Sequence, residues 1–261
     1  MIIDIHTHAW PQKIARKARV NLESLFKTKL ICLPTPKTLL RFMKKNNISV
    51  SVVCAVATKP EQVSSINAWL FKIRSRRLRV FCALHPEYKF WKDELRKIKI
   101  NGDGIKLQPE FQDFYVDERR VYPMYEEIER LGLPILFHCG KELSGTMLVR
   151  SSPPRILKIR KRFPRLKIIA AHFGGFRLWK EVKKYLLGKD IYLDTSFFFG
   201  YLPRKEIRDM LLRHPGKRLL FGSDFPLTNP KNDLDYLEGL GLPEGLRKRI
   251  LYLNAKELLQ I

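Results

Sequence analysis

Short apolar segments alternate along nearly the whole chain with longer segments in which apolar residues recur about every 3.6 positions. The short segments are rich in Ile, Val and Leu, which is typical of buried parallel strands. Eight of them can be placed, at residues 2–6, 48–56, 79–85, 104–108, 134–138, 167–172, 191–194 and 218–223.

The segments with a helical period lie between these predicted strands. They cover residues 36–45, 61–74, 90–98, 122–131, 154–162, 178–187 and 205–212, and one more, 244–251, follows the last strand. Parallel neighbours need helical crossovers, and closing the sheet removes both of its edges. The pattern therefore predicts a single-domain (β/α)8 barrel over residues 1–261, a length that suits this fold. An open doubly wound sheet is the structural alternative.

Two segments depart from the alternation. Residues 11–33 form a basic, partly helical insertion after the first strand, and residues 139–153 form a loop with several glycines and prolines after the fifth. Both leave the carboxyl ends of strands, where barrel enzymes build their substrate sites. Residues 254–261 are predicted to form a short closing helix with Asn254 as its N-cap.

Charge is the main anomaly of the composition. The formal net charge is +24, and such an excess invites a polyanionic partner such as nucleic acid or a phosphorylated substrate. The basic residues are spread over several predicted outer helices and do not form one stripe. Solvated helix faces explain most of them, so a nucleic-acid partner is not favoured.

Several features bear on location. Four widely spaced cysteines without a C-x-x-C pair suit buried thiols in a reducing compartment. The first residues, MIIDIHTHAW, do not resemble a signal peptide, and no apolar segment approaches the ~20 residues that span a bilayer. We therefore expect a soluble cytoplasmic protein without a membrane partner. Association into a homo-oligomer stays open.

Potential metal ligands follow several of the predicted strands. His6 and His8 are two residues apart at the end of the first strand, so both imidazoles should lie on the same side. His138 and His172 end the fifth and sixth strands, and Asp224 follows the eighth. All five reach the face of a barrel where active sites lie, and imidazole with carboxylate is a ligand set for a divalent metal such as zinc.

Four motifs together resemble the amidohydrolase superfamily. They are the D-x-H-x-H start at residues 4–8, AHFGG at 171–175, FGSDFP at 221–226 and NAKELL at 254–259. Within it, the chain is most similar to the amidohydrolase-related barrels that include aminocarboxymuconate semialdehyde decarboxylase. The resemblance implies that His6, His8, His138 and Asp224 hold one metal, usually zinc. It also implies that His172 is a catalytic acid/base or an electrostatic group beside the metal.

This ligand set predicts metal-dependent hydrolysis. A zinc-bound water has a pKa lowered to about 7, and Asp224 would take its proton while His172 stabilises the oxyanion of a small amide, ester or lactone substrate. A decarboxylase of a small carboxylic acid on the same site is the first alternative. A TatD-like metal-dependent nuclease is the second, although no acidic residue ends the fourth strand. A non-enzymatic basic barrel that binds nucleic acid is the third.

Two further ionisable residues are candidates beside the metal. Asp4 is expected either to orient one of the imidazoles or to be a structural carboxylate. Lys106, at the end of the fourth strand, lies where binuclear members of the superfamily carry a carboxylated lysine. If it were carboxylated, a second metal would bind and His172 would become a ligand. Unmodified, it could hold a substrate carboxylate.

The remaining candidates would line the substrate pocket. His85 ends the third strand, and Arg150, in the loop after the fifth, could clamp a carboxylate or phosphate. Trp10 and the aromatic segments 111–115 and 197–201 could form an apolar wall above the metal.

Overall fold

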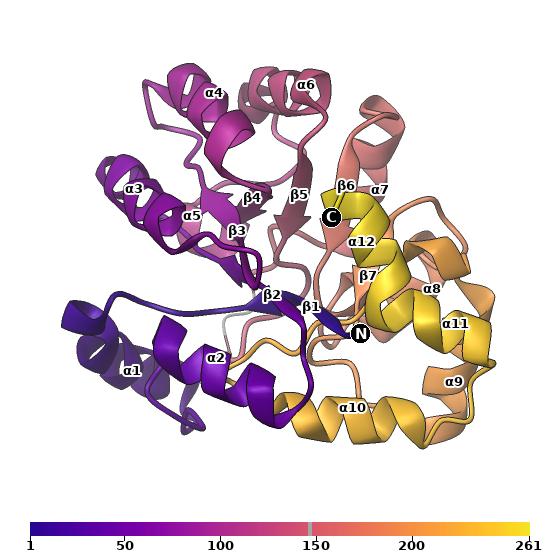
Figure 1. The fold of residues 1–261 in the computed structure, drawn as a ribbon. Helices are drawn as coiled ribbons and strands as arrows, with labels where there is room; N and C mark the ends of the chain where they lie inside the picture. The colour runs from indigo at the N-terminus through magenta and orange to yellow at the C-terminus, as the bar shows by residue number, and fades with distance from the viewer. Residues whose placement is uncertain (146–147) are drawn as a thin grey trace.

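The chain forms a barrel of eight parallel strands that are joined in the order of the sequence. The computed structural model describes residues 1–145 and 148–261. Figure 1 shows the barrel with helices around it and both chain ends on the side that faces the viewer. The strands are β1 (Ile3–Thr7), β2 (Val50–Cys54), β3 (Leu78–Ala83), β4 (Gly104–Leu107), β5 (Pro134–Phe137), β6 (Lys167–Ala170), β7 (Tyr192–Asp194) and β8 (Leu219–Leu220).

The residues that follow β8 close the barrel against β1. The amide of Ile5 donates to the carbonyl of Phe221 at 2.9 Å, and the amide of Asp224 donates to the carbonyl of His6 at 2.8 Å. The expected (β/α)8 barrel is thus confirmed, and the open doubly wound sheet is wrong. Strand β8 is shorter than the expected eighth strand, because the backbone of residues 221–225 hydrogen-bonds to β1 without forming a regular ladder.

The helices cover the outside of the barrel. They are α1 (Gln12–Phe26), α2 (Pro36–Lys45), α3 (Val63–Ile73), α4 (Trp91–Asn101), α5 (Pro109–Gln112), α6 (Tyr122–Leu131), α7 (Pro153–Arg162), α8 (Trp179–Tyr185), α9 (Arg204–Arg213), α10 (Pro230–Glu238), α11 (Glu244–Lys248) and α12 (Asn254–Leu259). Within residues 1–145 and 148–261, none of the helices has the length and hydropathy needed to cross a bilayer.

The apolar period explains most of these helices, because most of them place an apolar stripe against the strands. Helix α10 was not expected, although Asn229 caps it by accepting from the amide of Lys231 at 3.2 Å. The closing segment also differs from the expectation. Asn254 continues a helical backbone from α11, and its side-chain amide donates to the carbonyls of Gly216 and Leu219, at 2.7 Å each. Asn254 is therefore a tether to the barrel and not an N-cap.

An irregularity in β1 decides which way its polar residues point. Asp4 pairs with Ser51 of β2, but Thr7 pairs with Val53, so β1 contains one extra residue between the two pairs. Such a bulge breaks the alternation of side chains that a regular strand imposes. A common face for Asp4 and His6 would need an unbroken strand, and β1 is interrupted between Asp4 and Thr7.

Asp233, on α10, is a buried carboxyl with an unusually high pKa. The hydroxyl of Thr228 donates to its Oδ2 atom at 3.0 Å and also contacts the carbonyl of Ser223. Burial raises the pKa of Asp233 from 3.8 to about 8, and the hydrogen bond from Thr228 offsets only part of that rise.

We expect Asp233→Asn to stabilise the protein at alkaline pH. The folded pKa lies above the unfolded value, so the wild-type carboxyl loses stability as the pH rises from about 4 to about 8. Asparagine keeps an oxygen that accepts from Thr228 and does not ionise, so its advantage should grow by up to about 1 kcal/mol per pH unit in that interval. Urea unfolding at pH 5, 7 and 9 measures this, and a difference that does not change with pH would contradict it.

Candidate metal centre

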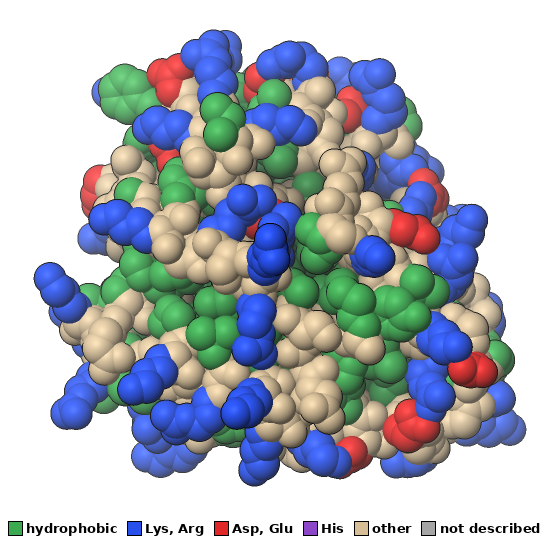
Figure 2. Space-filling view, viewed as in Figure 1, with side chains coloured by type: hydrophobic (Ala, Val, Ile, Leu, Met, Phe, Trp, Pro, Cys, Tyr) green, Lys and Arg blue, Asp and Glu red, His purple; other side chains and the backbone are tan. Residues whose placement is uncertain are grey.

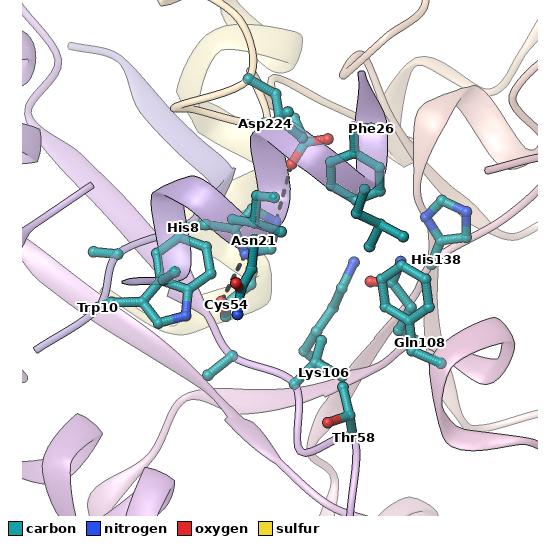
Figure 3. Close-up of a pocket in the computed structure, with 18 of the residues that line it drawn as sticks. His8, Trp10, Asn21, Phe26, Cys54, Thr58, Lys106, Gln108, His138 and Asp224 are labelled. Carbon is teal, nitrogen blue, oxygen red and sulfur yellow. Dashed lines mark hydrogen bonds and ion pairs between the residues drawn. The ribbon is translucent and has the colours of Figure 1, made fainter. Parts of the chain in front are cut away.

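A cavity of about 970 Å³ opens at the carboxyl ends of the strands. Its floor is polar and its outer walls are mainly apolar. Figure 3 shows Lys106 and His138 pointing into this space from one side, with His8 and Asp224 on the other. The candidate residues that line it are His6, His8, Lys106, His138, His172 and Asp224, and from the expected aromatic wall Trp10, Phe111 and Phe197.

His6, His8 and Asp224 form a group with metal-binding potential. One ligand atom of each lies within 4.8 Å of the ligand atoms of the other two. The Oδ1 atom of Asp224 is 2.9 Å from Nε2 of His8 and 3.6 Å from Nε2 of His6. The ends of β1 and β8 bring these three residues together, since the amide of Asp224 donates a hydrogen bond to the carbonyl of His6.

The hydrogen bonds of His8 test whether a cation fits this group. Nδ1 of His8 lies 2.9 Å from the carbonyl oxygen of Cys54, which can only accept, so Nδ1 carries the proton. In the neutral ring, Nε2 then presents a lone pair to Asp224, and Oδ1 of Asp224 is buried without a hydrogen-bond partner. Two electron-pair donors face each other, an arrangement that a metal ion between them would satisfy.

His6 is held by an aspartate that sequence reasoning missed. Its Nδ1 lies 3.0 Å from Oδ2 of Asp194, at the end of β7, so Nε2 is free to face Asp224 and the Lys106 amine, which is 3.2 Å away. Asp4 does not orient an imidazole. It accepts from the hydroxyl of Ser223 at 2.6 Å and from the backbone of His6. The signal for Asp194 was available, because it is the acid that ends a predicted strand.

We expect Asp194→Asn to weaken metal binding by about 10- to 100-fold, since a carboxylate behind a ligand histidine fixes the ring and raises its basicity. Titration of the protein with Zn²⁺ or Mn²⁺ in a metal buffer measures the affinity. Asp190→Asn is the matched control, because Asp190 lies four residues earlier, at the opposite end of β7, and pairs with surface arginines. Equal effects of the two substitutions would contradict the orienting role.

A chain of hydrogen bonds links Asp194 to His172 and His138. The hydroxyl of Ser196 donates to Asp194, so His172 donates its Nδ1 proton to Ser196 at 2.9 Å. Nε2 of His172 must then accept from Nδ1 of His138, 3.0 Å away. This leaves Nε2 of His138 with a lone pair, and that atom is buried without a hydrogen-bond partner. Ser196 is a second residue that sequence reasoning missed.

His138 is not grouped with the other three expected ligands. Its Nε2 lies 3.1 Å from Glu142, which accepts from Gln108 at 2.7 Å, and the metal-binding group that contains it consists of Glu110, His138 and Glu142. His138 nevertheless lines the same cavity, one residue beyond the end of β5. The structure thus brings together three of the four expected ligands and places the fourth beside them, across His172.

The electrostatics of the floor favour neutral His6 and His172 beside an ionised aspartate. Burial raises the pKa of Asp224, but His6 and His8 outweigh it and hold that pKa well below its usual range. Burial lowers the pKa of His172 to about 4, and burial together with Lys106 lowers the pKa of His6. Near neutral pH, His6 and His172 therefore offer lone pairs and Asp224 offers a negative charge.

Of the other expected candidates, Lys106 lines the cavity, whereas His85 and Arg150 do not. Lys106 is only 1% exposed and its amine reaches the floor, whereas its carboxylation stays a prediction. His85 and Arg150 are not among the lining residues. Nδ1 of His85 accepts from the amide of Glu87 at 3.2 Å, and Arg150 pairs with Asp113 beside α5. His85 is thus engaged in a turn and Arg150 in an ion pair, both away from the metal centre.

The chain belongs to a known family. Residues 3–261 match the family model described as Amidohydrolase, so the chain is a member of the amidohydrolase family. A curated relative, the gamma-resorcylate decarboxylase of Polaromonas sp. (strain JS666), is 22% identical over 184 residues. That match covers 56% of each protein, so it spans little more than half of the relative's length.

Solved structures of several proteins share the fold. A dihydroxybenzoic acid decarboxylase from Polaromonas sp. JS666, with bound manganese and the inhibitor 2-nitroresorcinol, superimposes with a TM-score of 0.73 at 19% identity, over 99% of this chain and 96% of that one. A putative 2-pyrone-4,6-dicarboxylic acid hydrolase from Pseudomonas putida gives 0.68 at 16% identity, over 99% and 97%. At these identities the likeness is one of fold.

Proposed function

We propose that this protein is a metal-dependent decarboxylase of a small carboxylic acid. The observation that carries the proposal is the group of His6, His8 and Asp224 at the floor of a mainly apolar cavity. In this group, electron-pair donors face one another, and Oδ1 of Asp224 has no hydrogen-bond partner. His138 is the proposed fourth ligand, because its Nε2 is buried and has a lone pair without a partner. The named decarboxylase relatives support the same assignment.

The residues fit the needs of decarboxylation. When bound, a divalent metal would supply a cationic centre for the oxygens of the acid. The apolar walls exclude water from the carboxylate, which favours its loss as carbon dioxide because the product is neutral. The bonding electrons stay on the substrate carbon, and that carbon has to gain a proton.

His172 is the proposed proton carrier. Burial lowers its pKa to about 4, so the ring is neutral near pH 7. It would take up one proton from solvent and pass it to the substrate carbon as carbon dioxide leaves, since its protonated form is a stronger acid than a free imidazolium. Ser196 and Asp194 hold the ring from behind through its Nδ1 atom. The Lys106 amine, which lies beside His6, would hold a negatively charged oxygen of the substrate.

The hydrolase expected first from the sequence has less support. One named structural relative is a putative hydrolase, but the curated relative and the manganese-bound structure are decarboxylases. None of the relatives named above is a nuclease. On the face that Figure 2 shows, the positive charge has no single focus, since Lys and Arg side chains are scattered there among acidic and hydrophobic ones.

Incubation of the metal-loaded protein with dihydroxybenzoates and related aromatic acids tests the proposal. We expect release of carbon dioxide, loss of this activity after chelation, and recovery on addition of Mn²⁺ or Zn²⁺. Parallel assays with amides, esters, lactones, DNA and RNA cover the other functions. Metal-dependent turnover of one of those substrates, with no carbon dioxide release from any acid, would overturn the assignment.

A further inference from the structure

The outer part of the cavity lies between two helices, α1 and α3. The cavity-lining residues of α1 recur at the spacing of one helix face, and they are Ile14, Lys17, Ala18, Asn21, Leu22, Leu25 and Phe26. From α3 come Ser65, Ile66 and Trp69, again one turn apart. Figure 1 shows α1 at the edge of the molecule, beside α2 and below α3. One face of each helix thus borders the cavity.

Helix α1 does not bury its apolar stripe against the barrel. Of its 15 residues only Ala15 is buried, whereas Ile14 is 48% and Leu25 43% exposed. A surface helix normally packs such a stripe on the core. Here the stripe faces the cavity, and α1 is held from its carboxyl end, where Phe26 stacks on Phe111 with ring centroids 6.3 Å apart.

The cavity is larger than a single-ring acid needs. Its volume of about 970 Å³ is at the upper end of the ~300–1,000 Å³ typical of pockets for drug-sized ligands. The polar and metal-binding side chains are concentrated at the floor. Two exposed lysines, Lys17 of α1 and Lys141 after β5, also line the cavity and attract an anion toward it.

We propose that the substrate is an amphipathic acid, with its carboxylate-bearing head at the metal centre and an apolar tail, larger than one ring, between α1 and α3. The position of the head rests on the proposed function, whereas the tail site rests on the exposed stripe of α1 and the opposing Ile66 and Trp69. A tail there would cover the apolar side chains that the fold leaves facing water.

Binding of 4-alkylbenzoates to the metal-loaded protein tests the tail site without requiring turnover. The dissociation constant, followed by calorimetry, should fall about threefold to fourfold for each added methylene from methyl to hexyl, as burial of a methylene predicts. A dissociation constant that does not depend on tail length would overturn the proposal. If tail length matters but no acid is decarboxylated, the proposed function fails while the tail site stands.

Two leucines with similar exposure provide a matched pair of variants. Leu25 lines the cavity, whereas Leu212, on α9, is 41% exposed and does not. Leu25→Asp should raise the dissociation constant of 4-hexylbenzoate about tenfold or more and leave that of benzoate unchanged. Leu212→Asp should change neither. An equal effect of both substitutions would contradict the proposal.

A second copy of the chain is the competing occupant of the stripe. Sedimentation at the concentrations of the binding experiment separates the two cases. We expect Leu25→Asp to leave the oligomeric state of the wild-type protein unchanged. If it instead dissociates an oligomer, and tail length has no effect on binding, the stripe is a self-association surface and the proposal is wrong.

Discussion

Asp224→Asn is expected to lower the rate of decarboxylation by about 10³-fold or more while leaving the fold intact. The substitution keeps the size of the side chain but removes the negative charge that faces His6 and His8. Residue 224 has a φ of 61°, in the left-handed region, and asparagine tolerates that conformation as well as aspartate does. The loss should therefore come from the metal centre and not from backbone strain.

Initial rates, metal content and thermal unfolding measured on the same preparations separate these effects. Asp209→Asn, on the exposed surface of α9, is the control and should match the wild type in all three. We expect the Asp224 variant to lose metal and activity together and to unfold near the wild-type temperature measured without metal. Full metal content together with more than a tenth of the wild-type rate would contradict the assignment of Asp224 as a ligand.

Gly140→Ala is expected to destabilise the protein by about 3 kcal/mol or more. Gly140 has a φ of +98°, and a Cβ atom there would lie 2.1 Å from the backbone nitrogen of Phe176. That approach joins the loop after His138 to the loop after His172, because Phe176 donates to the carbonyl of Cys139 at 2.9 Å and Lys141 donates to that of Phe176 at 3.0 Å. The alanine would push the two loops apart, so activity should fall as well.

Gly188→Ala separates steric conflict from conformational strain. Gly188 has a φ of +79°, but an added Cβ atom there would meet nothing within 4 Å. We expect this control to cost only about 1 kcal/mol, the penalty of the left-handed conformation. Thermal or urea unfolding compares the two variants. Similar losses of stability would mean that the contact with Phe176 is not the cause.

The architecture could be predicted because it depends on patterns that the chain itself carries. Each of the eight strands is a short apolar segment, and seven of the expected helical segments appear as helices at nearly the expected residues. The eighth, at residues 244–251, was less accurate. It divides between α11 and a stretch of π-helix, and Asn254 then continues the helical backbone where a cap was expected. Such local irregularities depend on tertiary contacts that have no periodic signature.

The candidate site could be predicted in part. Strand-end placement selected His6, His8 and Asp224, and the structure brings these three together. Strand-end placement did not lead to Asp194 or Ser196, although both lie at the end of β7. The sequence also left Asp4 as either an orienter of an imidazole or a structural carboxylate, because a bulge of one residue in β1 cannot be seen from the alternation of residue types.

The sequence by itself determined the strand order, the number of strands and the end of the barrel at which the ionisable residues lie, since the period of the apolar positions and the ends of the strands are local properties. The tertiary structure decided which atoms face one another. Only the folded chain sets the proton positions on His8 and His172, the separation of His138 from the other ligands and the apolar space under α1. Those features arise where distant segments meet, and their distances depend on packing that no single segment encodes.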